Sequence, residues 1–129
     1  YIIRDHDSAM FACRQEMMWH IAKLLNEKYG EGTVTLTMKE QYRNMKEMIE
    51  PCMHLIDNAK KAVQQSGLNP ETVAIRGGTD GARLSFMGLP CPNLGTGGYA
   101  FHGPCEHITV EGMDYAVENL KNIVKLYAC

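Results

Sequence analysis

Apolar residues recur every three or four positions in several parts of the chain, which is the spacing of one face of an α-helix. The helices predicted in this way cover residues 8–29, 51–66, 80–86 and 111–127. Asp7 or Ser8 can cap the first of these helices and Gly30 can end it. The apolar rows expected to be buried are Met10, Cys13, Met17, Ile21, Leu24 and Leu25 in the first helix, and Met113, Ala116, Val117, Leu120, Ile123, Val124 and Tyr127 in the last.

Shorter segments have the composition of β-strands. Residues 33–38 alternate between polar and apolar side chains, which predicts a strand with one buried face. Residues 1–3 and 72–75 are also predicted as strands, and a further short strand is expected in the proline- and glycine-rich stretch that starts at Pro90. Helices that alternate with short strands are typical of an α/β fold.

Composition narrows the class of protein. The chain has 129 residues, of which 45% are hydrophobic and 22% charged, so a folded core is expected rather than disorder. A net charge of −2 disfavours nucleic-acid binding, and no apolar run has the length of a membrane span. Five cysteines without a repeated spacing, and the lack of a visible leader, favour reduced thiols and a cytoplasmic location. Because the chain opens on Tyr1 within a predicted strand, we expect it to be a piece of a longer protein.

The densest group of chemically versatile side chains lies between His102 and His107. It contains two imidazoles, the thiol of Cys105 and the carboxylate of Glu106, which are the main types of zinc ligand. A zinc site takes at least three protein ligands, so one His and one Glu do not complete it. From spacing alone, an exposed loop with two incidental histidines is an equally good interpretation.

A second candidate is the glycine-rich loop from Arg76 to Gly81. Adjacent glycines let backbone N–H groups approach a ligand, and the start of the following helix favours an anion. The guanidinium of Arg76 adds a fork that fits a carboxylate or a phosphate. No Lys-Ser/Thr pair follows, so this is not a nucleotide-binding P-loop, and a tight turn with a surface arginine is equally consistent with the pattern.

Longer motifs point to a known family. The stretch from Arg76 to Asn93, with Thr96-Gly-Gly-Tyr99 and Phe101-His-Gly103, closely resembles the peptidase T family, the tripeptide aminopeptidases of the M20 dizinc metallopeptidases. Matches at Ile3-Arg-Asp5 and around Asn44 extend the resemblance over essentially the whole chain, which is similar to the C-terminal third of such an enzyme. The resemblance implies an α/β zinc-peptidase catalytic domain with an inserted ferredoxin-like lid domain. Residues 1–47 would be the second half of the lid, and residues 48–129 the C-terminal part of the catalytic domain.

The resemblance also implies site residues. His102 matches the family's last zinc ligand, and Glu106 would support it from the second coordination shell. The residues that match substrate-binding positions are Arg4, Asn44, Arg76, Gly77, Gly78, Thr79 and Asp80. The other ligands of the two zinc ions and the general base would lie upstream, so no catalytic residue is expected in this chain. The family usually has Asn where this chain has Ala100.

The function expected from the resemblance is zinc-dependent release of the N-terminal residue of tripeptides by the complete protein, with this chain inactive by itself. The expected partners are a small peptide substrate and either a second copy or the missing N-terminal part, with no nucleic acid and no membrane. One alternative is a binding module in which His102, Cys105 and His107, with Cys91, hold a structural zinc ion. Another is an inactive fragment that forms dimers through the lid half.

Overall fold

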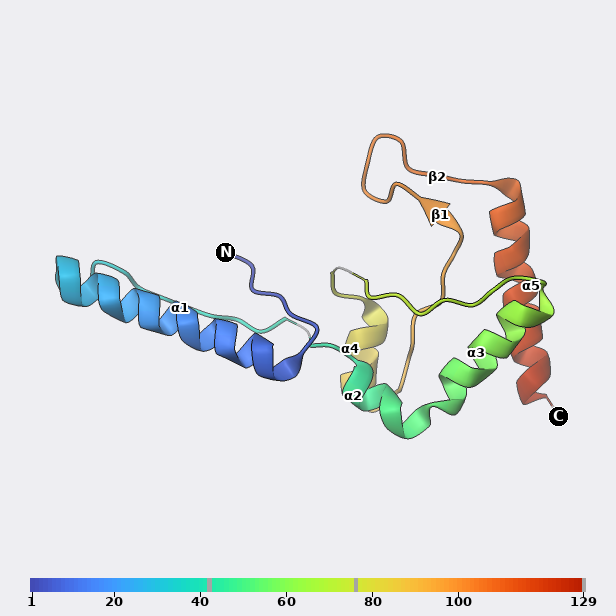
Figure 1. Cartoon of the computed structure of the whole chain (residues 1–129), viewed down its shortest axis with the longest axis horizontal. Helices are drawn as coiled ribbons and strands as arrows, with labels where there is room; N and C mark the ends of the chain where they lie inside the picture. The colour runs from blue at the N-terminus through green and yellow to red at the C-terminus, as the bar shows by residue number, and fades with distance from the viewer. Residues whose placement is uncertain (42, 76, 129) are drawn as a thin grey trace. The chain divides into compact units, whose positions relative to one another are not determined.

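The computed structural model describes residues 1–41, 43–75 and 77–128. Its elements in chain order are α1 (Ser8–Tyr29), α2 (Lys46–Ile49), the 3₁₀ helix η1 (Glu50–Cys52), α3 (His54–Gln65), α4 (Asp80–Phe86), β1 (Gly98–Tyr99), β2 (His107–Ile108) and α5 (Val110–Tyr127) (Figure 1). Helices with a small two-stranded sheet are compatible with a fragment of an α/β fold. Within the described ranges, no helix combines the length and the apolar character needed to cross a bilayer.

The chain divides into two compact units. The first comprises the described residues of 1–44 and 76–78, and the second comprises those of 45–75 and 79–129. This division identifies neither unit as a lid or a catalytic domain, so the domain assignment stays a prediction.

The predicted helices are present, and side chains cap the first turns of α1, α4 and α5, whereas α3 has no side-chain cap. Oδ1 of Asp7 accepts a hydrogen bond from the backbone N–H of Met10 at 2.9 Å, which caps α1. The hydroxyl of Thr79 caps α4 in the same way. The second predicted helix differs, because it is preceded by two short helical turns, α2 and η1. Pro51 lies in η1, and since it lacks a backbone N–H it interrupts the hydrogen bonding between α2 and α3.

Three of the predicted strands are wrong. Residues 1–3, 33–38 and 72–75 are not strands in the described structure. A strand forms only where its N–H and C=O groups pair with a neighbouring strand, and the sequence pattern does not supply that neighbour. The segment after residue 33 instead runs extended beside α1 (Figure 1). The two strands that do form, β1 and β2, pair antiparallel with Gly98 opposite Ile108.

Few apolar side chains are buried in the described structure. The buried ones are Ala22, Ile49, Ala62 and Ala82. The apolar row expected to be buried on α5 is largely exposed: Met113, Val117, Leu120, Val124 and Tyr127 are between 46% and 67% exposed. On α1, Met10, Met17, Ile21 and Leu24 are also exposed. The prediction that these rows are covered is therefore wrong for most of their members, and Leu25, Ala116 and Ile123 are half-buried.

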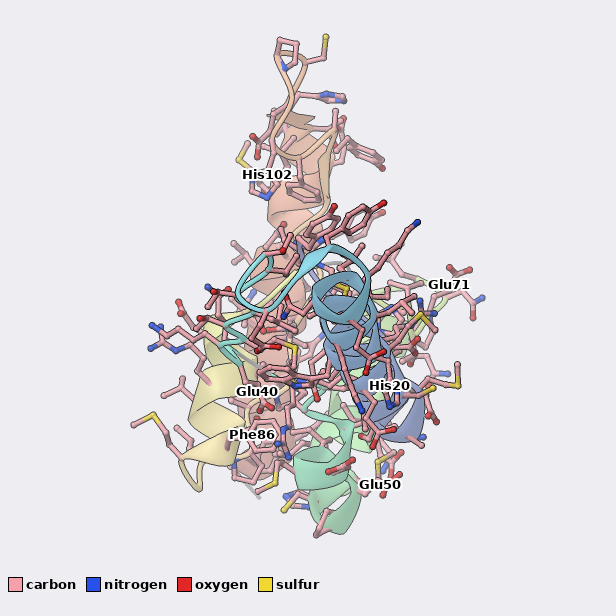
Figure 2. All side chains as sticks on the ribbon, turned by 90° about the vertical axis from the view of Figure 1, so that its left-hand side faces the viewer. His20, Glu40, Glu50, Glu71, Phe86 and His102 are labelled. Carbon is pink, nitrogen blue, oxygen red and sulfur yellow. The ribbon has the colours of Figure 1, made fainter. Side chains whose placement is uncertain are left out.

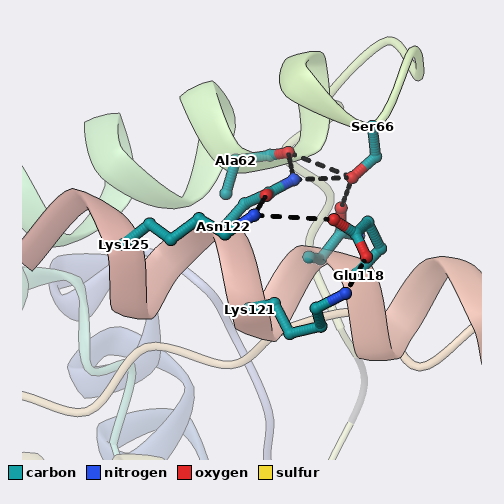
Figure 3. Close-up of polar contacts among 7 residues, drawn as sticks. Ala62, Ser66, Glu118, Lys121, Asn122 and Lys125 are labelled. Carbon is teal, nitrogen blue, oxygen red and sulfur yellow. Dashed lines mark hydrogen bonds and ion pairs between the residues drawn. The ribbon is translucent and has the colours of Figure 1, made fainter.

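Polar side chains also join α3 to α5 (Figure 3). Asn122 is 6% exposed, and its Nδ2 donates to the hydroxyl of Ser66 at 3.2 Å and to the carbonyl of Ala62 at 3.4 Å. The Ser66 hydroxyl donates in turn to Oδ1 of Asn119 at 2.8 Å. A buried amide is stabilising only when its hydrogen bonds are made, so these contacts determine how the two helices pack.

The segment after α4 folds back onto that helix. Ser85 is completely buried, and its hydroxyl donates to the carbonyl of Gly81 at 2.7 Å and accepts from the N–H of Cys91 at 3.0 Å. A Cβ atom on Gly81 would lie 2.5 Å from the carbonyl oxygen of Cys91, so only glycine fits there. Asn93 reaches the start of the helix and donates from Nδ2 to the hydroxyl of Thr79 at 3.2 Å.

Candidate functional site

The group of candidate zinc ligands lies in the connection between β1 and β2, where Figure 2 labels His102. Two consecutive turns make up this connection. In the first, the N–H of Gly103 donates to the carbonyl of Ala100 at 3.1 Å, and in the second the N–H of Glu106 donates to the carbonyl of Gly103 at 3.1 Å. Pro104 occupies the second position of the second turn, where its fixed φ is favourable.

The first turn has an uncommon backbone. His102 has a φ of 64° and Ala100 a φ of 53°, and among the described residues other than glycine these two alone have positive φ values. His102 is the third residue of its turn, the position where a type II turn requires a positive φ. For an L-residue with a side chain this conformation costs about 1–2 kcal/mol. Neighbouring contacts must therefore stabilise the turn.

Glu106 provides one of these contacts. Its Oε2 accepts a hydrogen bond from the backbone N–H of His102 at 3.2 Å. The carboxylate therefore binds the main chain of His102 and not its imidazole. The His102 side chain is exposed, and its ring forms no hydrogen bond with any part of the chain that the structure describes. The structure thus brings His102 and Glu106 together and leaves the ring nitrogens accessible.

His107 is held in a different way. Its ring stacks on that of Tyr99, with centroids 5.4 Å apart and planes inclined by 17°. Its Nδ1 donates to the carbonyl of Cys105 at 2.8 Å. The ring of His107 therefore has contacts within the hairpin, whereas that of His102 does not.

The donor set fits zinc only as part of a larger site. Across residues 1–41, 43–75 and 77–128, no three His, Cys, Asp or Glu side chains are grouped so that they could hold a metal ion. The self-contained site considered from the sequence, with His102, Cys105, His107 and Cys91, is thus not assembled among the described residues. One exposed imidazole would suit a single coordination position of a zinc ion, whose other ligands would then have to come from outside the described residues.

The hairpin is fixed to the start of α5 by two glycines. A Cβ atom on Gly97 would lie 3.1 Å from Cα of Gly112, so the two main chains touch. Gly97 also has a φ of 82°, which glycine adopts without strain. The sequence pattern did not predict this contact, although an isolated glycine within a predicted helix, as at Gly112, often has a packing reason.

The predicted substrate-binding residues divide between the two units. In the first unit, Arg4 is exposed, and Asn44 donates from Nδ2 to the carbonyl of His6 at 2.8 Å, so Asn44 lies against the segment that carries Arg4. Gly77 has a φ of 114°, and Gly78 is exposed. Arg76 lies outside the described residues.

The remaining two predicted residues belong to the second unit. Thr79 is engaged as the N-cap of α4, and its hydroxyl also accepts from Asn93. Asp80 is the first residue of that helix and is exposed. An acidic residue in the first turn interacts favourably with the helix dipole, so a structural role for Asp80 is consistent with this position.

One carboxylate near Arg4 has a perturbed pKa. The backbone N–H of Asp7 donates to Oδ1 of Asp5 at 3.0 Å, and Nε of Arg14 lies 2.8 Å from Oδ2 of Asp5. These contacts, with the Asp7 N–H as the larger cause, hold the pKa of Asp5 below its ordinary value. The charged form of Asp5 therefore ties the N-terminal segment to α1.

The amino-acid sequence is similar to those of proteins with known names, although not to a family model. No family model matches the chain. It is 60% identical over 128 residues to a peptidase T of Clostridium perfringens, which covers 99% of this chain and 32% of that protein. The identity is 54% over 127 residues to a peptidase T of Caldanaerobacter subterraneus, and 50% over 128 residues to one of Desulfitobacterium hafniense. The chain spans about a third of the length of the curated relatives it matches.

Proposed function

The chain belongs with the peptidase T proteins along nearly its whole length, and from this premise we propose that the complete protein is a zinc-dependent aminopeptidase that releases the N-terminal residue of tripeptides. The observation that carries the proposal is the 60% identity over 99% of the chain. Because the chain corresponds to about a third of its relatives' length, the activity is proposed for the complete protein and not for this chain alone.

In this proposal His102 is one of the ligands of a two-zinc site. Zinc would supply a Lewis acid for the scissile carbonyl and would lower the pKa of a bound water. The exposed ring of His102, with no hydrogen bond to the described residues, supports a ligand role. The remaining ligands and the general base are proposed to lie in residues outside this chain.

Substrate binding is assigned to the residues that match the family's lid and cleft. The guanidinium of Arg4 is permanently charged and has the fork geometry that suits a peptide carboxylate. Asn44 and the loop 76–80 would border the same substrate. The proposal also treats residues 1–47 as half of a ferredoxin-like lid and residues 48–129 as part of the catalytic domain.

The exposed apolar rows support a larger folded protein. On α5 alone, five large side chains spaced three or four residues apart are between 46% and 67% exposed. A stable domain of this size normally covers such a row. Its relatives are about three times as long, and we propose that the additional residues cover these rows. A cytoplasmic location is proposed from the cysteines, since Cys13, Cys52, Cys91 and Cys105 are free thiols in the described structure.

The test uses the complete protein loaded with zinc and trialanine as substrate. We expect release of free alanine, a zinc content of two per chain, and a loss of kcat/KM of about a thousandfold in His102→Ala, since metal polarisation supplies several kcal/mol. The matched control is His20→Ala, which removes an exposed histidine on α1 and should leave activity unchanged. The 129-residue chain alone should be inactive.

Two outcomes would decide against the proposal. If the zinc-loaded complete protein cleaves no tripeptide, the aminopeptidase assignment is wrong. If His102→Ala and His20→Ala are equally active and retain equal zinc, His102 is not a ligand. A binding module or a dimerising fragment would then be the better interpretation.

A further inference from the structure

The turn that carries His102 has a strained backbone, which a histidine does not need in order to bind zinc. Two residues with side chains, Ala100 and His102, adopt positive φ values within three positions. Glycine would accept either position without strain. A strained backbone persists only where surrounding contacts hold it, and such strain clusters at functional sites.

The carboxylate of Glu106 is the contact that acts on this strain directly. The turn itself uses the N–H of Gly103 and the carbonyl of Ala100, so it does not satisfy the N–H of His102. Oε2 of Glu106 accepts from that N–H at 3.2 Å, while the backbone N–H of Glu106 donates to Gly103 at 3.1 Å. Glu106 therefore binds the connection through both its side chain and its main chain, and closes residues 102–106 into a ring.

We propose that Glu106 is a positioning residue that holds the backbone of His102 in its left-handed conformation, so that the imidazole is presented in one orientation with both ring nitrogens accessible. This inference rests on the proposed function in one respect, namely that the imidazole binds zinc. Outer-shell carboxylates commonly accept a hydrogen bond from the ring of a metal-bound histidine. Here the carboxylate accepts from the main chain, which fixes the direction of the Cα–Cβ bond of His102 without occupying either ring nitrogen.

The first experiment needs no metal and uses the 129-residue chain. Hydrogen exchange of the His102 amide is measured by NMR in the unmodified chain, Glu106→Ala, Glu106→Gln and the control Glu71→Ala, which removes an exposed carboxylate elsewhere in the same unit. Glu106→Ala should accelerate exchange by about tenfold or more, because the charge-assisted bond is lost. Glu106→Gln should stay within about threefold, because its amide oxygen can accept the same bond. Equal rates in all four chains would overturn the proposal.

The second experiment uses the complete protein and measures zinc affinity by competition with a chelator, beside kcat and KM for trialanine. Loss of an outer-shell partner typically weakens metal binding by 10–100-fold, so Glu106→Ala should do so, Glu106→Gln should restore most of the affinity, and Glu71→Ala should have no effect. A role limited to folding would instead lower thermal stability and leave the affinity of the folded protein unchanged.

The two proposals fail in different ways. If the unmodified complete protein binds zinc and cleaves tripeptides, but Glu106→Ala has the same zinc affinity, the positioning role is wrong and the proposed function stands. If the unmodified protein neither binds zinc nor cleaves tripeptides, the proposed function fails and the ligand-positioning role fails with it. The exchange measurement then still reports whether Glu106 holds the turn.

Discussion

The side-chain amide of Asn26 pairs with both main-chain groups of Val34. Its Oδ1 accepts from the N–H of Val34 at 2.8 Å, and its Nδ2 donates to the carbonyl of Val34 at 3.0 Å. This is the hydrogen-bonding pattern that a residue on a neighbouring strand would provide. Asn26 thus ties the extended segment to α1 at Val34, and Thr33 adds hydrogen bonds to the carbonyl of Gly30.

Removing this amide should release the segment. In Asn26→Ala both hydrogen bonds are lost, and in Asn26→Asp the donor is lost while the acceptor remains. We expect amide exchange at Val34 to accelerate by about tenfold in Asn26→Ala, since a net hydrogen bond contributes about 1 kcal/mol, and by less in Asn26→Asp. Glu16→Ala, an exposed substitution on α1, is the control. Unchanged exchange in both variants would show that packing holds the segment.

Ser85→Ala should destabilise the chain more than its size suggests. The buried hydroxyl accepts from the N–H of Cys91, and its loss leaves that donor without this partner. The expected cost is about 1–3 kcal/mol in the free energy of unfolding, measured with urea. Met87→Ala, at an 80% exposed position next to α4, should change stability by less than about 0.5 kcal/mol. If Ser85→Ala and Met87→Ala lowered the free energy of unfolding equally, the hydrogen bond between Ser85 and Cys91 would not be what stabilises the α4 region.

On α5, removal of a buried polar side chain should lower the free energy of unfolding more than removal of an exposed apolar one. Asn122→Ala removes a buried amide that bridges to α3 and should cost about 1–3 kcal/mol. Val124→Ala removes methyl groups that are already exposed and should cost less than about 0.5 kcal/mol in this chain. Urea unfolding of the two variants gives the comparison. The reverse order would mean that the apolar row of α5 is covered in the isolated chain, for example by self-association.

Ala100 offers a stabilising substitution. Its φ of 53° is strained for alanine but is well tolerated by asparagine and by glycine. Ala100→Asn should therefore raise the melting temperature, with a gain of up to about 1 kcal/mol. Ala12→Gly, on the exposed face of α1, should lower stability by a similar amount because glycine is a poor helix former. Loss of stability in Ala100→Asn would mean that the turn differs in solution.

Acid should loosen the N-terminal segment through Asp5. Because the pKa of Asp5 is held below its unfolded value of about 3.9, its contribution to stability is present above that pH and is lost as the pH falls through the lower folded pKa. NMR titration of the Asp5 carboxyl measures this pKa. Arg14→Ala should raise it only in part, since the Asp7 N–H remains as the larger cause. If the pKa of Asp5 returned fully to its ordinary value in Arg14→Ala, Arg14 and not the Asp7 N–H would be the larger cause of the shift.

Local signals predicted the helices well. Capping depends on residues three positions apart, so the sequence alone narrows the cap of α1 to Asp7 or Ser8, and Asp7 is the one that forms the bond. Strands and burial depend on partners distant in the chain. The alternation of residues 33–38 is real, yet the local pattern does not reveal whether a partner strand is at hand.

The candidate site shows the same contrast between features that depend on neighbouring residues and features that depend on the fold. His102 and Glu106 are four residues apart and share a hydrogen bond. That bond is to the main chain of His102 and depends on a positive φ, which neither residue type predicts. The residues assigned to substrate binding, such as Arg4 and Thr79, come from separate units, so their common role stays a prediction.

The contact between Gly97 and Gly112 has a consequence for how the imidazole is located in space. Main-chain atoms touch there without an intervening side chain, so the hairpin has little freedom to shift against α5. A small rotation of α5 therefore displaces the His102 turn by a comparable amount. Substitution of the buried Asn122, which holds α5 to α3, would then change the position of the His102 turn without touching it. The position of the proposed zinc ligand thus depends on how α5 is held by α3.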